Sequence, residues 1–340
     1  MNSRADEVAD FLAQNGWSEA QKAPLAGDAS ARRYERLTMR DSKTAVLMDA
    51  PPEAGQQTEP FVAIAKHLNT LGLSAPEIYA ADSERGFLLI EDLGDDLFAH
   101  MVLKDTSLEH PLYEAAADVL IALHQHPPPA GLQHMNTQTL GEMIEPVFSW
   151  YVAGAGREWK KPWLAFHAEI RPILEAHIGP PDTIVLRDYH AENLLWLPDR
   201  IGDARVGLLD FQDAVLGHKA YDLVSLLQDA RRDVPSETEH HVKDYFVRKS
   251  GLDPEMFNIA YSLLGAQRNL RIIGVFARLC MHYGKRDYVD MIPRVYDLAM
   301  HNLQHPLLQG PAELLSSALP APTPDLLENL KAQCATIPTP

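Results

Sequence analysis

The hydrophobic pattern of this chain changes near residue 92, and that change restricts the folds open to it. Before it, apolar and polar residues alternate or form short β-branched runs, whereas after it apolar residues recur every three or four positions. The first pattern predicts strands and the second predicts helices. Strands and helices that are segregated along a chain indicate an α+β protein. We therefore predict a small β-rich N-terminal lobe over residues 1–92 and a larger, mainly helical lobe over residues 93–310.

In the N-terminal lobe, the spacing of apolar residues and the positions of turn residues predict the strands and helices. A polar turn between two alternating or β-branched runs predicts a hairpin, and glycines follow two of the amphipathic stretches, as they do at helix ends. The expected strands occupy residues 33–39, 44–49, 78–81 and 86–90, and the expected helices occupy residues 6–12 and 58–71.

Two short apolar runs interrupt the helical pattern of the second part. Residues 184–186 and 205–209 are flanked by polar loops, which predicts strands in an otherwise helical region and marks a candidate site. Apolar residues from Ile259 to Cys280 form one stripe, as expected for a long buried helix. Because the last 30 residues hold six prolines and no aromatic residue, we expect residues 311–340 to form a loosely attached tail with one short helix near its middle.

Charge and cysteine usage narrow the class of protein. Lys and Arg number 30 against 47 Asp and Glu, which gives a formal net charge of -17, and no basic cluster occurs. This balance argues against nucleic-acid and membrane-surface partners. The two cysteines have no metal-like spacing, and the most apolar stretch is too short to cross a bilayer. We expect a cytoplasmic protein without a nucleic-acid or membrane partner, and we expect it to be a monomer.

Polar segments follow both interrupting strands. Asp188 precedes Asn193 by five positions, and Asp210 follows Asn193 by seventeen, across a strand, turn and strand that could form a hairpin. Phosphoryl transfer from ATP needs a carboxylate to accept the proton of the attacking hydroxyl, and hard oxygen ligands for Mg²⁺. One Asp and one Asn amide oxygen are enough for the metal, because Mg²⁺ also takes water and phosphate oxygens. The second Asp then serves as the base.

The Asp-x4-Asn segment followed by Asp-Phe is the pair of loops typical of kinases. With them, the chain resembles the aminoglycoside phosphotransferase family, the small-molecule branch of the protein-kinase-like fold. The likeness covers most of the chain and is sharpest over residues 186–234, where it is similar to the N-acetylmuramate/N-acetylglucosamine anomeric kinases of cell-wall recycling. The resemblance implies a bilobal α+β fold and an ATP- and Mg²⁺-dependent kinase that phosphorylates the C1 hydroxyl of these amino sugars.

The resemblance also implies roles for single residues. Asp188 takes the position of the catalytic base, while Asn193 and Asp210 take the metal positions. Asp222 takes the position of the buried carboxylate that braces the catalytic loop. Residues 91–94 resemble the hinge between the lobes. Its main-chain N–H and C=O groups, at Glu91 and Leu93, would form hydrogen bonds with the edge of the adenine ring. Residues 27–33 fall at the phosphate-covering turn, where small residues such as Ser30 let backbone N–H groups approach phosphate oxygens.

Three residues depart from the family pattern. Leu186 replaces the usual His two positions before the base, so packing must support the loop. Gln212 stands where a protein kinase has the Gly of Asp-Phe-Gly. Met48 stands where the strand would place the phosphate-binding Lys, so Arg32 or Arg33 would supply the missing cation.

Substrate contacts are expected from four residues. Recognition of the lactyl carboxylate of N-acetylmuramate would need a bidentate Arg, for which Arg231 or Arg232 is the candidate. Glu192 and Asp213 are candidates for hydrogen bonds with sugar hydroxyls. Residues 228–233 could instead be a solvated helix end.

Two alternative functions stay open. The net charge of -17 also suits polycationic aminoglycosides as substrates. The missing Lys at Met48 would suit a non-catalytic nucleotide-binding protein. A protein kinase is disfavoured, because only about ten residues separate Asp210 from the helix that begins near Tyr221, which leaves no room for an activation loop.

Overall fold

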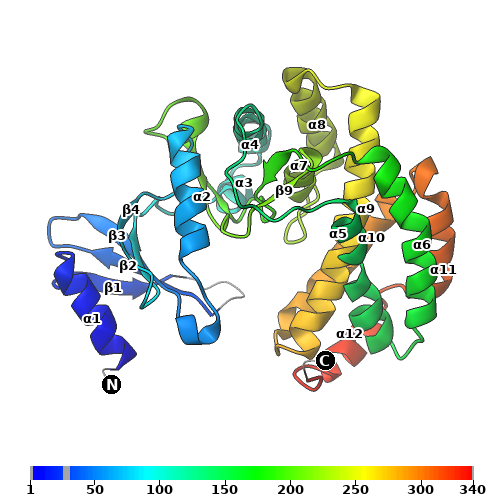
Figure 1. Cartoon of the computed structure of the whole chain (residues 1–340), viewed down its shortest axis with the longest axis horizontal. Coiled ribbons are helices and arrows are strands. Elements are labelled where there is room, and N and C mark those ends of the chain that lie inside the picture. The colour runs from blue at the N-terminus through cyan, green and yellow to red at the C-terminus, as the bar shows by residue number, and fades with distance from the viewer. Residues whose placement is uncertain (1–2, 26–30, 339–340) are drawn as a thin grey trace. The chain divides into compact units, whose positions relative to one another are not determined.

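The computed structural model describes residues 3–25 and 31–338, which form two compact units (Figure 1). The sheet unit comprises Met1–Pro129 and Leu186–Ala214, and the helical unit comprises Ala130–Val185 and Val215–Pro340. The chain therefore leaves the sheet unit after Pro129 and returns to it at Leu186. These units are divided differently from the lobes expected at residues 1–92 and 93–310, which remain a prediction.

Five antiparallel strands form the main sheet, in the order β1-β2-β3-β5-β4. The predicted hairpin is confirmed, with Tyr34 opposite Met48. The edge strand β1 was missed, because its four exposed residues carry no apolar alternation. The strands are β1 (Gln21–Pro24), β2 (Arg33–Thr38), β3 (Thr44–Asp49), β4 (Ile78–Asp82) and β5 (Phe87–Ile90).

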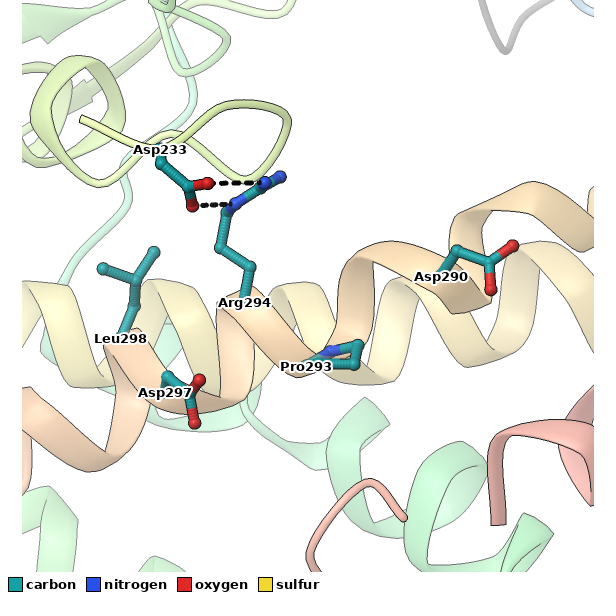
Figure 2. A pocket seen from close by; sticks show the side chains of 6 residues that line it. All are labelled: Asp233, Asp290, Pro293, Arg294, Asp297 and Leu298. Atoms are coloured by element: carbon teal, nitrogen blue, oxygen red, sulfur yellow. Dashed lines mark hydrogen bonds and ion pairs between the residues drawn. The ribbon is translucent and has the colours of Figure 1, made fainter. Parts of the chain in front are cut away.

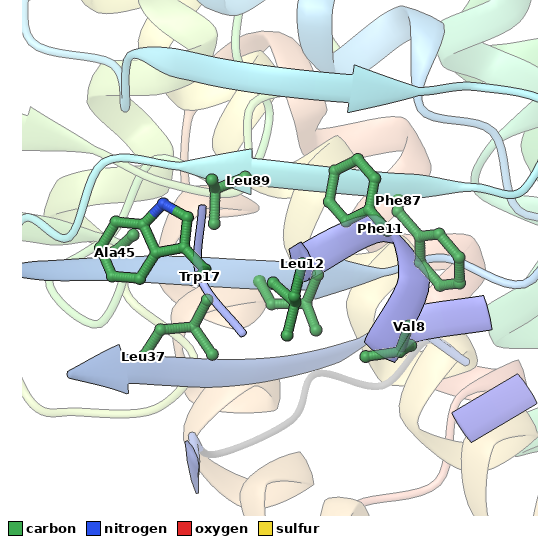
Figure 3. Close-up of a cluster of buried hydrophobic side chains, with 9 residues drawn as sticks. Val8, Phe11, Leu12, Trp17, Leu37, Ala45, Phe87 and Leu89 are labelled. Atoms are coloured by element: carbon green, nitrogen blue, oxygen red, sulfur yellow. The ribbon is translucent and has the colours of Figure 1, made fainter. Parts of the chain in front are cut away.

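One face of this sheet packs against helix α1 (Arg4–Gln14), which ends at Asn15 and Gly16 as predicted. Because successive side chains point to opposite faces of a strand, Arg36, Val46 and Met48 belong to the other face. The cluster on the α1 face is shown in Figure 3 and consists of Val8, Phe11, Leu12, Trp17, Leu37, Ala45, Leu47, Phe87 and Leu89.

A small hairpin completes the sheet unit and carries the polar segments. Its strands β7 (Leu194–Trp196) and β8 (Val206–Leu208) pair antiparallel. The hairpin is attached to the preceding chain, because the Leu208 N–H donates to the Ser74 carbonyl over 2.8 Å. The helices of this unit are α1, α2 (Glu59–Thr70), α3 (Phe98–Lys104) and α4 (Glu109–His124), with 3₁₀ turns at Pro52–Ala54, Thr106–Leu108 and Gly202–Arg205.

The helical unit is built around α9 (Pro254–Met281), whose predicted apolar stripe is buried from Leu263 to Cys280. A two-stranded ladder joins β6 (Thr183–Val185) to β9 (Val215–Gly217). None of the helices in the described part of the chain combines the length and apolar character needed to cross a bilayer. The other helical segments are α5 (Thr137–Glu142), a π-helix (Val147–Val152), α6 (Lys160–His177), α7 (Ala220–Leu227), α8 (Ser236–Ser250), α10 (Ile292–Asn302), α11 (Gln309–Ala318) and α12 (Pro324–Ala332), with 3₁₀ turns at Arg286–Met291 and Pro306–Leu308.

The expectation of a loosely attached C-terminal tail is wrong, although its short helix is present as α12. Leu330 of α12 is fully buried, and the Ala335 N–H donates to the Cys280 carbonyl over 3.1 Å. The high proline content was wrongly interpreted as a sign of a loose segment, because proline is also favoured in the first turn of a helix. Pro324 opens α12 directly after Thr323, whose hydroxyl caps the helix.

Gly274 of α9 fixes how closely this helix approaches the segment before the π-helix. A Cβ at Gly274 would lie 2.1 Å from the carbonyl carbon of Pro146 and 2.2 Å from the Val147 nitrogen. Because main-chain atoms cannot swing aside, we expect Gly274→Ala to lower the free energy of unfolding by about 3 kcal/mol. The measurement is urea denaturation followed by circular dichroism.

Gly310→Ala in α11 is the matched control for this prediction. A Cβ at Gly310 would meet only Glu169 Oε2, at 3.4 Å. We expect this change to raise the free energy of unfolding by about 0.5–1 kcal/mol, because alanine favours the helix more than glycine does. Equal stability of the two variants would contradict the proposed close approach at Gly274.

Candidate active site

The catalytic loop, residues 186–193, is fixed from two sides within the sheet unit. The Tyr189 hydroxyl donates to the Ala116 carbonyl of α4 over 2.8 Å, in a buried position. Arg187 Nη1 donates to the Asp213 carbonyl over 3.3 Å. Arg187 also has a φ of +73°, which is uncommon outside glycine and is typical of strained backbone at functional loops. The buried hydrogen bond of Tyr189 helps to support the loop in which Leu186 stands in place of the expected His.

Asn193 connects the two ends of the catalytic loop. Its Nδ2 donates to the main-chain carbonyl of Asp188 over 2.8 Å, and its N–H donates to the His190 carbonyl over 2.8 Å. Because the amide nitrogen faces Asp188, the amide oxygen of Asn193 is left for another partner. The buried His190 ring lies within hydrogen-bonding distance of Asn193, with 3.3 Å between a ring nitrogen and Asn193 Nδ2.

The β7–β8 hairpin brings the two predicted segments together. Leu194 pairs with Leu208, and the Leu209 N–H donates to the Asn193 carbonyl over 3.0 Å. Asp210 therefore follows directly on a residue that is hydrogen-bonded to Asn193, which in turn is hydrogen-bonded to Asp188. The structure thus confirms the predicted convergence of the two loops, while the roles of the three side chains remain a prediction.

The metal loop, residues 209–213, is anchored by its aromatic side chain. Phe211 is fully buried and its ring lies 4.8 Å from that of Phe61 in α2, centroid to centroid. Asp210 has a φ of +56°, a left-handed conformation that Asp adopts more readily than most residues. Gln212 Nε2 donates to Asp210 Oδ1 over 2.6 Å. The carboxylate is therefore held in place from its own loop.

The donor set at these two loops suits Mg²⁺. Asn193 offers an amide oxygen and Asp210 a carboxylate, and both are hard oxygen ligands. Two protein ligands of this kind leave coordination positions for water and for phosphate oxygens, which is how Mg²⁺ is usually held in phosphoryl-transfer sites. The residues present therefore fit the metal that the resemblance implies.

The predicted hinge follows β5, and its main-chain groups are partly occupied. The Glu91 N–H donates to the Glu77 carbonyl over 2.8 Å, and the Gly94 N–H donates to Asp92 Oδ1 over 3.1 Å. In the part of the chain that the structure describes, the Leu93 N–H makes no hydrogen bond. Of these donors, Leu93 is thus the one available to an adenine edge, and Glu91 could contribute only its carbonyl.

Arg36 of β2 binds this hinge and the residue that follows it, a set of contacts that the sequence did not predict. We call these contacts the Arg36 clamp. Arg36 Nε lies 2.8 Å from Asp92 Oδ2, Nη1 lies 2.8 Å from Asp95 Oδ2, and Nη2 donates to the Gly94 carbonyl over 3.2 Å. The hydrogen bond that Arg36 donates to Asp95 is the main cause that raises the pKa of Arg36, and the same bond lowers the pKa of Asp95. The available signal was a charged residue on the sheet face opposite α1.

The phosphate-binding residues are placed in part. Ser30 lies outside the described residues. Met48 is fully buried on the sheet face opposite α1, so that position holds no cation. Arg33 is the first residue of β2 and, by strand alternation, points to the α1 face. Arg32 precedes the strand and has no assigned sheet face.

Two candidate sugar-binding residues lie in the catalytic and metal loops. Glu192 precedes Asn193 and Asp213 follows Gln212, and both side chains are exposed in the sheet unit. Asp222 belongs to the first turn of α7 in the helical unit and is 1 % exposed. Its burial agrees with the expectation of a buried carboxylate, and its bracing role stays a prediction.

Arg231 and Arg232 follow α7 in the helical unit, and both are half-buried. The interpretation of this run as a solvated helix end is wrong for its first two residues, because Gln228 and Asp229 are each 1 % exposed. Asp229 Oδ1 accepts from the Arg231 N–H over 2.8 Å, which fixes the backbone from which the arginines extend. Whether they bind substrate stays a prediction.

A separate cavity of about 510 Å³ lies along α10 in the helical unit (Figure 2). Its arginine, Arg294, is paired with Asp233 through contacts of 2.5 and 3.1 Å, which lowers the pKa of that carboxyl. It contains none of the residues predicted for the site. The lining residues are Asp233, Asp290, Pro293, Arg294, Asp297 and Leu298.

Sequence comparisons identify relatives across most of the chain. An N-acetylmuramate/N-acetylglucosamine kinase from Caulobacter vibrioides is 39% identical over 341 residues, which cover 87% of this chain and 91% of that protein. A protein with the same name from Pseudomonas aeruginosa is 34% identical over 320 residues, which cover 90% of this chain and 92% of that protein.

Structural comparisons confirm the predicted protein-kinase-like α+β fold. The ADP-bound aminoglycoside phosphotransferase APH(2'')-Ib gives a TM-score of 0.59 at 15% identity, covering 91% of this chain and 98% of that chain. Choline kinase LicA from Streptococcus pneumoniae gives 0.58 at 13% identity, covering 88% and 100%. The sequence model of the phosphotransferase enzyme family matches residues 23–256. The chain therefore belongs to the phosphotransferase enzyme family.

Proposed function

We propose that this chain transfers the γ-phosphoryl group of ATP to the anomeric C1 hydroxyl of N-acetylmuramate and N-acetylglucosamine. The observation that carries the proposal is the junction of the catalytic and metal loops, where Asn193 is hydrogen-bonded to Asp188 on one side and to Leu209 on the other. The choice of sugars is supported by the names of two relatives, because this chain aligns with about nine-tenths of the length of each.

Asp188 acts on the sugar hydroxyl. Its carboxylate orients the C1 hydroxyl and accepts its proton as the hydroxyl oxygen bonds to the γ-phosphorus. The bond from that phosphorus to the bridging oxygen of ADP breaks, which leaves the sugar 1-phosphate and ADP. An anomeric hydroxyl is more acidic than an ordinary alcohol, so one carboxylate is a sufficient base.

Asn193 and Asp210 hold Mg²⁺ in this proposal. When bound, the metal neutralises charge on the phosphates and fixes their orientation. Asp222 braces the catalytic loop, as the family resemblance implies. The Asn193–Asp188 hydrogen bond keeps the base and one metal ligand at a constant separation through the backbone.

ATP is held by main-chain groups and by a cation outside β3. We assign the adenine edge to the Leu93 N–H and the Glu91 carbonyl, and the phosphates to Ser30 and Arg32, with Arg33 the less favoured arginine because of its sheet face. The clamp from Arg36 keeps the hinge segment at the end of the sheet. Magnesium supplies part of the charge that Lys supplies elsewhere in the family.

The sugar contacts complete the proposal. Arg231 or Arg232 binds the lactyl carboxylate of N-acetylmuramate, and Glu192 and Asp213 bind sugar hydroxyls. Cysteine usage and the use of ATP favour a cytoplasmic reaction, and we propose that the chain acts as a monomer.

A screen of acceptors tests the proposal. We expect Mg²⁺-dependent ATP consumption with N-acetylmuramate and N-acetylglucosamine, and none with their 1-O-methyl glycosides, because the methyl group blocks the attacking oxygen. The sugar product should no longer reduce alkaline copper, since a C1 phosphate locks the ring. Phosphorylation of a 1-O-methyl glycoside would place the reaction at another hydroxyl.

The alternative substrate class is a polycationic aminoglycoside, which the net charge of -17 favours. ATP consumption with gentamicin and with neither amino sugar would establish that alternative. Absence of turnover with every acceptor would instead favour a non-catalytic nucleotide-binding protein.

A further inference from the structure

Gln212 of the metal loop has an unusual environment for an amide. Its side chain is only 7 % exposed, and its Nε2 donates to Asp210 Oδ1 over 2.6 Å. The reverse orientation would place two acceptor oxygens at that distance, so the carboxylate determines which end of the amide faces it. In the described part of the chain, the other end, Gln212 Oε1, is buried without a hydrogen-bond partner.

A buried amide oxygen without a partner is costly, which makes its presence beside Asp210 informative. Leaving such an acceptor unsatisfied costs about 1–3 kcal/mol. The loop does not relax to relieve it, because the backbone is fixed on both sides of Gln212. The fully buried Phe211 precedes it, and the carbonyl of Asp213, which follows it, accepts from Arg187 Nη1.

We propose that Gln212 is a positioning residue for the metal–nucleotide complex. Its amide nitrogen holds one oxygen of Asp210, so that the carboxylate presents the other oxygen to Mg²⁺. Its amide oxygen accepts a hydrogen bond from a donor that arrives with the hydrated Mg²⁺–nucleotide complex. Groups that orient metal ligands in this way contribute strongly to metal affinity. The proposal rests on the metal role given to Asp210 above, but not on the identity of the sugar.

The test measures ADP binding by calorimetry as a function of Mg²⁺ concentration, without any sugar. Gln212→Met keeps the length of the side chain and removes both the donor and the acceptor. We expect the Mg²⁺ concentration for half-maximal ADP binding to rise about 10- to 100-fold, which is the usual range for losing such a partner. ADP binding in the absence of Mg²⁺ should stay at its wild-type strength.

Gln138→Met is the matched control, because Gln138 is an exposed glutamine whose side-chain amide donates to Glu142 on its own helix. Its Mg²⁺ dependence should equal that of the wild type. Gln212→Gly, which introduces the protein-kinase residue, should change the Mg²⁺ dependence in the same direction as Gln212→Met. This second variant tests the idea if the methionine packs poorly.

Thermal unfolding without ligand separates a positioning role from a structural one. Removing a buried oxygen that lacks a partner should leave the unfolding temperature of Gln212→Met unchanged or raise it. A purely structural glutamine would lower the unfolding temperature and leave the Mg²⁺ dependence alone, which would overturn the proposal.

Four other outcomes also decide the matter. Wild-type Mg²⁺ dependence in both Gln212 variants overturns the proposal, and so does ADP binding that is independent of Mg²⁺ in the wild type. A change confined to the KM for the sugar also overturns it and assigns the amide to the substrate. If no amino sugar is phosphorylated but Mg²⁺-dependent ADP binding is weakened in both variants, the proposed substrate fails and the role of Gln212 stands.

Discussion

Asp188→Asn should lower kcat for N-acetylglucosamine by roughly 10³-fold, within the range of 10²- to 10⁴-fold that a general base contributes. The variant keeps the size of the side chain, and the hydrogen bond from Asn193 Nδ2 survives because it goes to the main-chain carbonyl of residue 188. What disappears is the group that accepts the proton of the attacking hydroxyl. Affinity for Mg²⁺-ADP should therefore stay at the wild-type value.

Single-turnover kinetics and calorimetry with ADP are the two measurements. Asp199→Asn is the control, because Asp199 is an exposed aspartate in the β7–β8 connection, outside the proposed site. It should retain wild-type kcat. A wild-type kcat in Asp188→Asn would show that Asp188 is not the general base. Loss of ADP binding in that variant would show that it acts on the nucleotide instead.

The elements that the sequence predicted correctly are those with a local apolar pattern. The hairpin β2–β3 and helices α2 and α9 each have apolar residues at the spacing of their own secondary structure, so periodicity alone reveals them. Strand β1 escaped because its four residues are all exposed and owe their extended form to pairing with β2. Helix α12 was predicted, but its close packing was not, because prolines that begin helices were taken as a sign of a loosely attached segment.

The convergence of the two loops was predictable because it depends on a short hairpin. Asn193 and Asp210 are joined by a strand, a connection and a strand, so local pairing decides their proximity. The two short strands that precede the polar segments also indicated a site, because they interrupt a helical pattern. The structure adds that the hairpin is held to the chain before β4 through Ser74, a contact without any sequence signature.

The Arg36 clamp could not be predicted in the same way. Its partners Asp92 and Asp95 lie more than fifty positions away in the chain, and the pairing depends on where the segment after β5 turns. Strand alternation could at most show that Arg36 faces away from the apolar cluster. Likewise, the sequence shows that Gln212 follows Asp210 by two positions, but not that its amide is buried.

Asp210→Asn should lower kcat by roughly 10³-fold, since a metal ion supplies several kcal/mol of charge stabilisation and each 1.4 kcal/mol is about tenfold in rate. Asparagine is the informative replacement. It tolerates the left-handed backbone at φ +56°, where alanine would add strain, and it still offers an oxygen to Gln212 Nε2. The loss therefore reports the missing negative charge on the metal ligand.

This variant should differ from Asp188→Asn in one measurement. Asp210→Asn loses Mg²⁺-dependent ADP binding together with turnover, whereas Asp188→Asn loses turnover alone. The reason is that the metal ligand acts on the nucleotide before any acceptor is bound, while the base acts only on the acceptor hydroxyl. Wild-type Mg²⁺-ADP affinity in Asp210→Asn would exclude this carboxylate as a ligand, because the loop and its anchor Phe211 are retained in the variant.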